Sequence, residues 1–95
     1  MNKLYVLVRK DLAPSYQAVQ AGHAVAEWLL HDQSWQNETL VYLGVRDETD
    51  LNRWVKKLDN KNISHVLFRE PDIDNQATAL ATYNDGRIFR NLKLM

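Results

Sequence analysis

The chain has 95 residues, enough for one domain with one hydrophobic core. Hydrophobic residues make up 45% and charged residues 25%, as in an ordinary globular protein, and no apolar run approaches the roughly 18 residues of a membrane span. Cysteine is absent, which excludes disulfides and thiol nucleophiles and favours a cytoplasmic location. Twelve basic and twelve acidic residues cancel, whereas a domain that binds nucleic acid by electrostatics alone is usually basic.

The first two predicted elements are a buried strand and an amphipathic helix. Residues 4–8 (LYVLV) form an apolar run that is typical of a central strand covered on both faces. Pro14 and Ser15 are expected to start a helix over residues 15–31, with Ser15 as its N-cap. Six side chains at helical spacing are expected to pack on the sheet: Ala18, Ala21, Gly22, Val25, Trp28 and Leu29. The neighbouring polar stripe consists of Tyr16, Gln20, His23 and Glu27.

Three further strands and a second helix follow. Residues 40–46 (LVYLGVR), 64–69 (SHVLFR) and 77–83 (ATALATY) are the predicted strands. Asp47 is expected to cap the second helix, whose apolar positions are Leu51, Trp54, Val55 and Leu58. An acidic loop (70–76) and a turn (84–86) flank the last strand, and the tail 87–95 is expected to contribute apolar contacts from Ile88, Phe89, Leu92 and Leu94.

This order predicts a single α/β domain over residues 1–95. Its elements run β-α-β-α-β-β plus a C-terminal tail, which gives a small sandwich of a four-stranded mixed sheet covered by helices. Strands joined through helices run parallel, through right-handed crossovers. The link 70–76 is too short for a crossover helix, so one strand is expected to run antiparallel.

Charged and polar residues gather where the parallel strands are predicted to end. In open α/β sheets the ligand site lies beyond these carboxyl ends, and a helix N-terminus there favours an anion. Arg9, Lys10 and Arg69 are therefore expected to surround a phosphate-sized position. The side chains beside it would be Tyr16, Gln20 and His23. The alternative is that charges flanking strands only mark where the chain meets water.

Two stretches carry a family resemblance. Residues 7–12 (LVRKDL) match a strand that ends in R-x-D-L, and residues 18–24 (AVQAGHA) match a helix motif A-A-Q-x-x-H-A. Both motifs belong to the type II peptidyl-tRNA hydrolases of archaea and eukaryotes, which the sequence resembles over nearly its whole length. Further matches follow in the family's order: Trp35, the corner Arg69-Glu70, residues 78–81 (TALA) and residues 92–95 (LKLM).

The resemblance implies cleavage of the ester bond between a peptide and the 3′ end of tRNA, without a metal or cofactor. Such chemistry needs an activated water, donors for the oxyanion and positive groups for the tRNA backbone. The residues that match the family's catalytic positions are His23, Gln20, Glu70 and Thr78. The residues implied to contact the substrate are Arg9, Lys10, Asp11, Tyr16 and Arg69.

Two departures from the family keep other functions open. The family has Gly-Lys four residues before its Gln, where this chain has Ser15 and Tyr16. Its D-A-G-R-T-Q loop is replaced by residues 70–76 (EPDIDNQ), whose carboxylates repel phosphate. One alternative is a non-catalytic module that binds RNA or a protein partner. Another is a homodimer that uses a sheet edge or a surface bearing tryptophan for assembly alone.

Several residues also have simpler interpretations. A metal site at Gln20, His23 and Glu27 is disfavoured because no second histidine is near. Asp72 and Asp74 are close enough in sequence to bind a cation, but paired carboxylates in a turn are usually only solvated. The remaining histidines, His31 and His65, are expected to be structural or solvated, and the expected packing residues are Trp28, Trp35 and Trp54.

Overall fold

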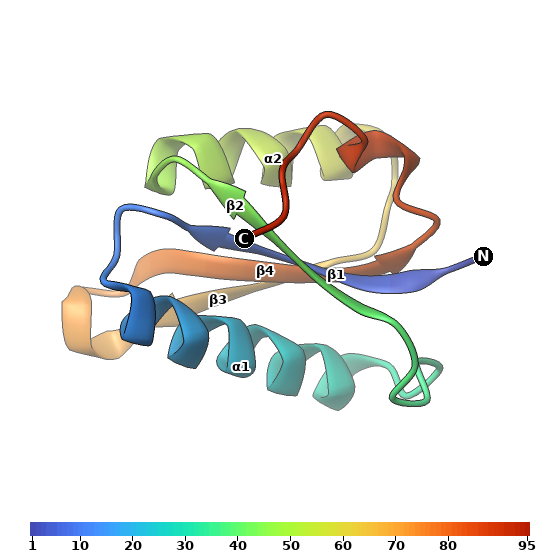
Figure 1. Ribbon diagram of the computed structural model, residues 1–95, viewed down its shortest axis with the longest axis horizontal. Helices are drawn as coiled ribbons and strands as arrows, with labels where there is room; N and C mark the ends of the chain where they lie inside the picture. Colours follow the sequence, from blue (N-terminus) through green and yellow to red (C-terminus); the bar gives the residue numbers. More distant parts are fainter.

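Four strands form one mixed sheet in the order β2-β1-β4-β3 in the computed structural model, which describes all 95 residues (Figure 1). The strands are β1 (Lys3–Arg9), β2 (Leu40–Val45), β3 (Val66–Glu70) and β4 (Gln76–Asn84). β1 pairs in parallel with β2, and β4 lies between β1 and β3, antiparallel to both. This arrangement confirms the predicted α/β fold, its element order and its single antiparallel strand.

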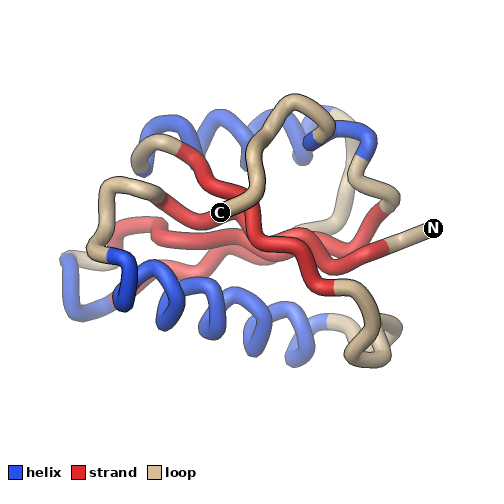
Figure 2. The backbone as a smooth tube through the Cα atoms, viewed as in Figure 1, coloured by secondary structure: helices blue, strands red, loops and turns tan.

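Two helices, α1 (Pro14–His31) and α2 (Glu48–Asn60), cover opposite faces of the sheet (Figure 2). Alternate residues of β1 face opposite layers: Val6 and Val8 join the core under α1, and Leu7 joins the core under α2. Because both faces are covered, β1 is a continuous apolar run, as its sequence predicts.

The buried face of α1 differs from the one expected. Its buried residues are Gln20, Ala21, Ala24 and Trp28, whereas Ala18 and Gly22 are exposed. A Cβ atom added to Gly22 would meet nothing within 4 Å, so this glycine does not permit close packing. The expectation is confirmed for Ala21, Trp28 and Val25 and wrong for Ala18, Gly22 and Leu29, of which Leu29 is 37% exposed. It was based on hydrophobicity, and Gln20 is buried with polar partners that a helical pattern does not show.

The two helices begin in different ways. Asp47 caps α2, as predicted, by accepting a hydrogen bond from the backbone N–H of Asp50 at 2.9 Å. The expected capping role of Ser15 was wrong, since Ala13 is the N-cap of α1 and gives no side-chain bond. Pro14 fits the first helical position because its missing N–H would have no partner there.

The C-terminal segment adds a short pairing to the outer edge of β2. A 3₁₀ turn, η2 (Arg87–Phe89), buries Phe89 against the α2 side of the core. Met95 N–H then donates to the carbonyl of Tyr42 at 3.1 Å, and Gly44 N–H donates to the carbonyl of Lys93 at 3.3 Å. Phe89 packs as expected, but Leu94 remains 73% exposed. No helix in this fold has the length and apolar character to cross a membrane.

Candidate active site

Polar side chains of β1, β3, β4 and α1 meet at the edge of the sheet where β1 and β3 end and β4 begins. They form two clusters. One, between α1 and the β3–β4 pair, contains Tyr16, Gln20, His23, Glu70 and Thr78 and is called the Gln20 cluster here. The other surrounds Arg9 at the end of β1.

Gln20 lies at the centre of its cluster and has no exposed surface. Its Nε2 donates to Glu70 Oε1 at 2.9 Å, and its Oε1 accepts from the hydroxyl of Thr78 at 2.6 Å. Both ends of the amide therefore have partners, which satisfies a polar group in the core and fixes its orientation. These contacts tie α1 to the last residue of β3 and to the interior of β4.

A β-bulge gives Thr78 its place in this network. Phe68 pairs with Ala79 and the next residue, Arg69, pairs with Ala77, so Thr78 on β4 has no opposite residue on β3. A bulge changes the direction of side chains on the strand that carries it. Here the bulged residue is the one that reaches Gln20.

Glu70 is 7% exposed and has two kinds of partner. Besides the bond from Gln20, its Oε2 accepts the backbone N–H of Asp72 at 3.3 Å, which caps the 3₁₀ turn η1 (Pro71–Ile73). The hydrogen bond from Gln20 lowers the pKa of Glu70, with further lowering by the Asp72 N–H and by the charge of His23. Glu70 is therefore a carboxylate at neutral pH.

His23 lies one turn beyond Gln20 on α1 and remains exposed. Its imidazole stacks on the ring of Phe68 in β3, with the centroids 4.4 Å apart and the planes 8° from parallel. Phe68 thus holds the imidazole on the side of the sheet where Glu70 lies. Sequence reasoning missed Phe68, although its alternation with Val66 indicates the α1 face of β3.

Tyr16, near the start of α1, is half-buried beside the same carboxylate. Burial raises the pKa of the Tyr16 phenol, and the carboxylates of Glu70 and Asp72 raise it further, with a hydrogen bond to Glu70 adding to the shift. Its hydroxyl is therefore protonated at neutral pH.

The structure brings the four predicted catalytic residues together but gives them different access to a ligand. Gln20 and Thr78 are both sealed from solvent, so they hold Glu70 in place and do not themselves present a surface to a substrate. His23 is exposed, whereas Glu70 is 7% exposed, and neither residue lines a hollow on the molecule.

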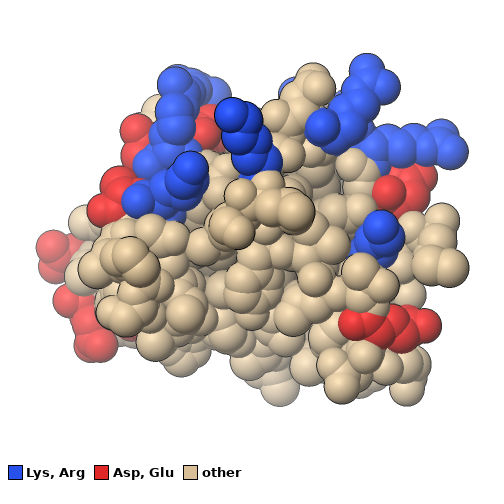
Figure 3. Space-filling model, viewed as in Figure 1, with Lys and Arg blue, Asp and Glu red and all other residues tan.

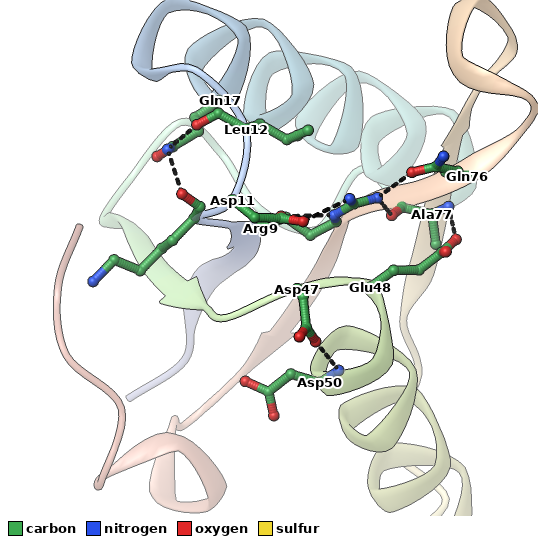
Figure 4. A network of polar contacts seen from close by, with 10 residues as sticks. Arg9, Asp11, Leu12, Gln17, Asp47, Glu48, Asp50, Gln76 and Ala77 are labelled. Atoms are coloured by element: carbon green, nitrogen blue, oxygen red, sulfur yellow. Dashed lines mark hydrogen bonds and ion pairs between the residues drawn. The ribbon is translucent and has the colours of Figure 1, made fainter.

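Arg9 does not form the expected phosphate position, because the residue is only 7% exposed and its guanidinium is bound by other groups of the protein (Figure 4). Nε and Nη2 donate to the carboxylate of Asp11 at 2.9 and 2.8 Å. Nη1 donates to the side chain of Gln76 at 2.9 Å and to the carbonyl of Ala77 at 3.1 Å. Arg9 and Asp11 thus join the end of β1 to the start of β4, a structural role.

The other expected phosphate ligands lie apart. The aliphatic chain of Lys10 runs over Gly44 of β2, where a Cβ atom would lie 2.4 Å from Lys10 Cδ. Arg69 is exposed on β3 and donates to the carbonyl of Asn75 at 3.3 Å. β2 and β3 are the two edges of the sheet, three strand spacings or about 14 Å apart. The side chain of Lys10 is therefore directed away from Glu70.

The simpler interpretations of several residues agree with the structure. Trp28 and Trp35 are buried in the core under α1, as expected, while Trp54 is half-buried beside Phe89. The Nδ1–H of His65 donates to the carbonyl of Ile63 at 2.9 Å, and His31 contacts Ser64 at 3.0 Å.

Acid is expected to weaken the fold through these clusters. The pKa of Glu70 is below its ordinary value of 4.5, and the bond from Arg9 lowers the pKa of Asp11 below 3.8. A carboxyl with a depressed folded-state pKa contributes stability that is present above its unfolded pKa and is lost as the pH falls through its folded pKa. The urea midpoint should therefore be constant above about pH 5 and fall below it, less steeply for Glu70→Gln. A midpoint that stays flat to about pH 3 would contradict this linkage.

Comparison with known proteins finds a similar fold but points to no activity. No family model and no curated protein matches the sequence. Among solved structures, a protein of unknown function from Agrobacterium tumefaciens strain C58 is similar, with a TM-score of 0.77 over 99% of this chain and 97% of that one. The two sequences are 14% identical, so the similarity concerns the fold alone.

Proposed function

We propose that the protein is a peptidyl-tRNA hydrolase-like enzyme, which cleaves the ester between a peptide and the 3′ end of tRNA. The observation that carries this proposal is the placement of His23, stacked on Phe68, beside the ionised carboxylate of Glu70. The resemblance to the type II peptidyl-tRNA hydrolases and the exposure of His23 support it. Such an enzyme acts in the cytoplasm, where tRNA is used.

The proposed chemistry is a hydrolysis with His23 as base and Glu70 as its electrostatic partner. A water beside His23 attacks the ester carbonyl carbon and loses a proton to the imidazole. The carboxylate of Glu70 stabilises the resulting imidazolium. The bond to the ribose oxygen then breaks, and His23 returns the proton to that oxygen. The products are a tRNA 3′-hydroxyl and a peptide carboxylic acid, which releases its proton to solvent at neutral pH. Tyr16 provides a protonated hydroxyl at the same site.

The alternative is a non-catalytic module that binds RNA or protein. The direction of the Lys10 side chain favours this alternative. With its stem over Gly44, Lys10 does not replace the ammonium group that the family has at the position of Tyr16. A homodimer also stays a prediction, which sedimentation equilibrium tests directly.

Turnover of peptidyl-tRNA separates the enzyme from the module. We expect the folded wild-type protein to release free peptide faster than buffer does, and Tyr16→Lys to raise the rate. If the wild type is inactive and Tyr16→Lys creates activity, the natural protein is the binding module. If both are inactive while circular dichroism and unfolding show a native fold, the proposal fails.

A further inference from the structure

The basic side chains of the molecule are segregated from α1. Residues 11–45, which include the whole of α1, contain no Lys or Arg. In the view of Figure 3, the Lys and Arg side chains gather over α2 and the C-terminal segment, and the part of the surface over α1 is uncharged or acidic. The zero net charge of the chain therefore hides a strongly uneven distribution.

Six basic residues line two grooves on the α2 side, and together they are called the α2 basic surface here. The first groove has a volume of about 390 Å³ and lies along α2 itself, next to Trp54. The second has a volume of about 370 Å³ and lies between the end of α2 and η2. The six residues are Arg53, Lys56, Lys57, Lys61, Arg87 and Arg90.

The two grooves adjoin one another. Trp54 of the first groove packs on Phe89, with ring centroids 5.3 Å apart, and Phe89 lies between Ile88 and Arg90 of the second. Asn60 of the first groove is followed directly in the chain by Lys61 of the second. The grooves therefore lie next to each other, along α2 and beside η2.

Four of the six residues of the α2 basic surface have no acidic partner. Arg53 and Arg87 make exposed ion pairs with Asp50 at 3.7 Å and Asp85 at 3.3 Å. The four without an ion pair are Lys56, Lys57, Lys61 and Arg90, of which Lys57 lies 4.7 Å over the ring of Trp54. Exposed, unpaired cations at neighbouring positions are what a polyanionic backbone binds.

We infer that the α2 basic surface holds the phosphate backbone of RNA, on the opposite side of the sheet from His23 and Glu70. The choice of RNA as the polyanion rests on the proposed function. The side of the molecule that bears Glu70 also carries Asp72 and Asp74, which repel phosphate, so the attraction for tRNA must come from elsewhere. The molecule measures only 24 and 22 Å along its two shorter axes. A single-stranded 3′ end of an RNA bound on the α2 side therefore has a short distance to cover around the edge of the molecule to reach Glu70.

Binding of deacylated tRNA tests this surface without any chemical step. The variant Lys56→Ala/Arg90→Ala removes one unpaired cation from each groove, and Lys3→Ala/Lys93→Ala removes the same charge outside both grooves. By fluorescence anisotropy at about 50 mM salt, the first variant should bind roughly tenfold more weakly than the wild type, with a salt slope smaller by about 2. The second variant should bind within about twofold of the wild type.

Three outcomes would overturn the inference: no binding of tRNA by the wild type at low salt, unchanged binding by Lys56→Ala/Arg90→Ala, or an equal loss in the control variant. These outcomes are distinct from failure of the proposed function. If the wild type binds deacylated tRNA through this surface but does not hydrolyse peptidyl-tRNA, the inferred RNA-binding surface is supported and the proposed activity is wrong. If the wild type hydrolyses peptidyl-tRNA but Lys56→Ala/Arg90→Ala does not change tRNA binding, only the inferred surface is wrong.

Discussion

Replacement of Gln20 by leucine is expected to lower the free energy of unfolding by about 3 kcal/mol, although the two side chains are similar in size. Gln20 is fully buried, and its amide is the donor to Glu70 and the acceptor from Thr78. Leucine leaves the carboxylate and the hydroxyl without these partners, and a buried group that loses its partner costs more than the bond itself contributed. Urea unfolding measures the change.

A double-mutant cycle tests whether this network is the cause. Thr78→Val alone removes the hydroxyl while keeping the branched shape, and it should cost about 1–2 kcal/mol. In Gln20→Leu/Thr78→Val one of the two orphaned groups is gone, so the double variant should be more stable than the sum of the single losses predicts. Additive losses, or a loss below about 0.5 kcal/mol for Gln20→Leu, would show that the contacts contribute little.

Replacement of Glu70 by glutamine is expected to lower kcat/KM for peptidyl-tRNA by about 100-fold or more. The variant keeps the shape of the side chain and an oxygen that can accept the bond from Gln20. It removes the negative charge that stabilises the imidazolium of His23 when the water is deprotonated. The measurement is initial-rate hydrolysis of peptidyl-tRNA under conditions where unfolding experiments show both proteins to be native.

The matched control for this change is Glu27→Gln. Glu27 lies one turn beyond His23 on α1, is exposed, and makes no ion pair or side-chain hydrogen bond. Glu27→Gln removes the same charge as Glu70→Gln, but from α1 instead of β3, so its rate should remain within about twofold of the wild type. Equal losses in the two variants would indicate a general electrostatic effect on tRNA binding, and an unchanged rate in Glu70→Gln would remove Glu70 from the mechanism.

The strand directions and the interior position of β1 were predictable, because they follow from local patterns and connection lengths. Residues 4–8 are apolar on both faces, and this pattern placed β1 in the interior of the sheet. The short link 70–76 excluded a crossover helix, and β4 is indeed antiparallel to its neighbours. The Asp47 cap was equally local, since the partner of its side chain lies three residues away.

The candidate site was predictable only in part because its contacts join residues that are far apart in the sequence. Gln20 is buried only because Glu70 and Thr78 satisfy its amide, and the bulge that leaves Thr78 unpaired depends on the register of β3 and β4. Arg9 is polar at the end of a strand, where solvent or phosphate is the usual partner, yet Ala77 and other groups of the chain itself surround it. Hydrogen bonds between buried polar groups that are far apart in the chain leave no periodic pattern in the sequence.

Peptidyl-tRNA hydrolysis by the wild type, His23→Ala, Glu70→Gln and the double variant tests most directly whether the imidazole and the carboxylate act as one unit. If they do, each single variant loses about 100-fold or more, and the double variant is scarcely slower than the slower single one. Losses that multiply in the double variant, or a folded wild type that is no faster than buffer, would contradict the proposal that His23 and Glu70 form a hydrolytic site.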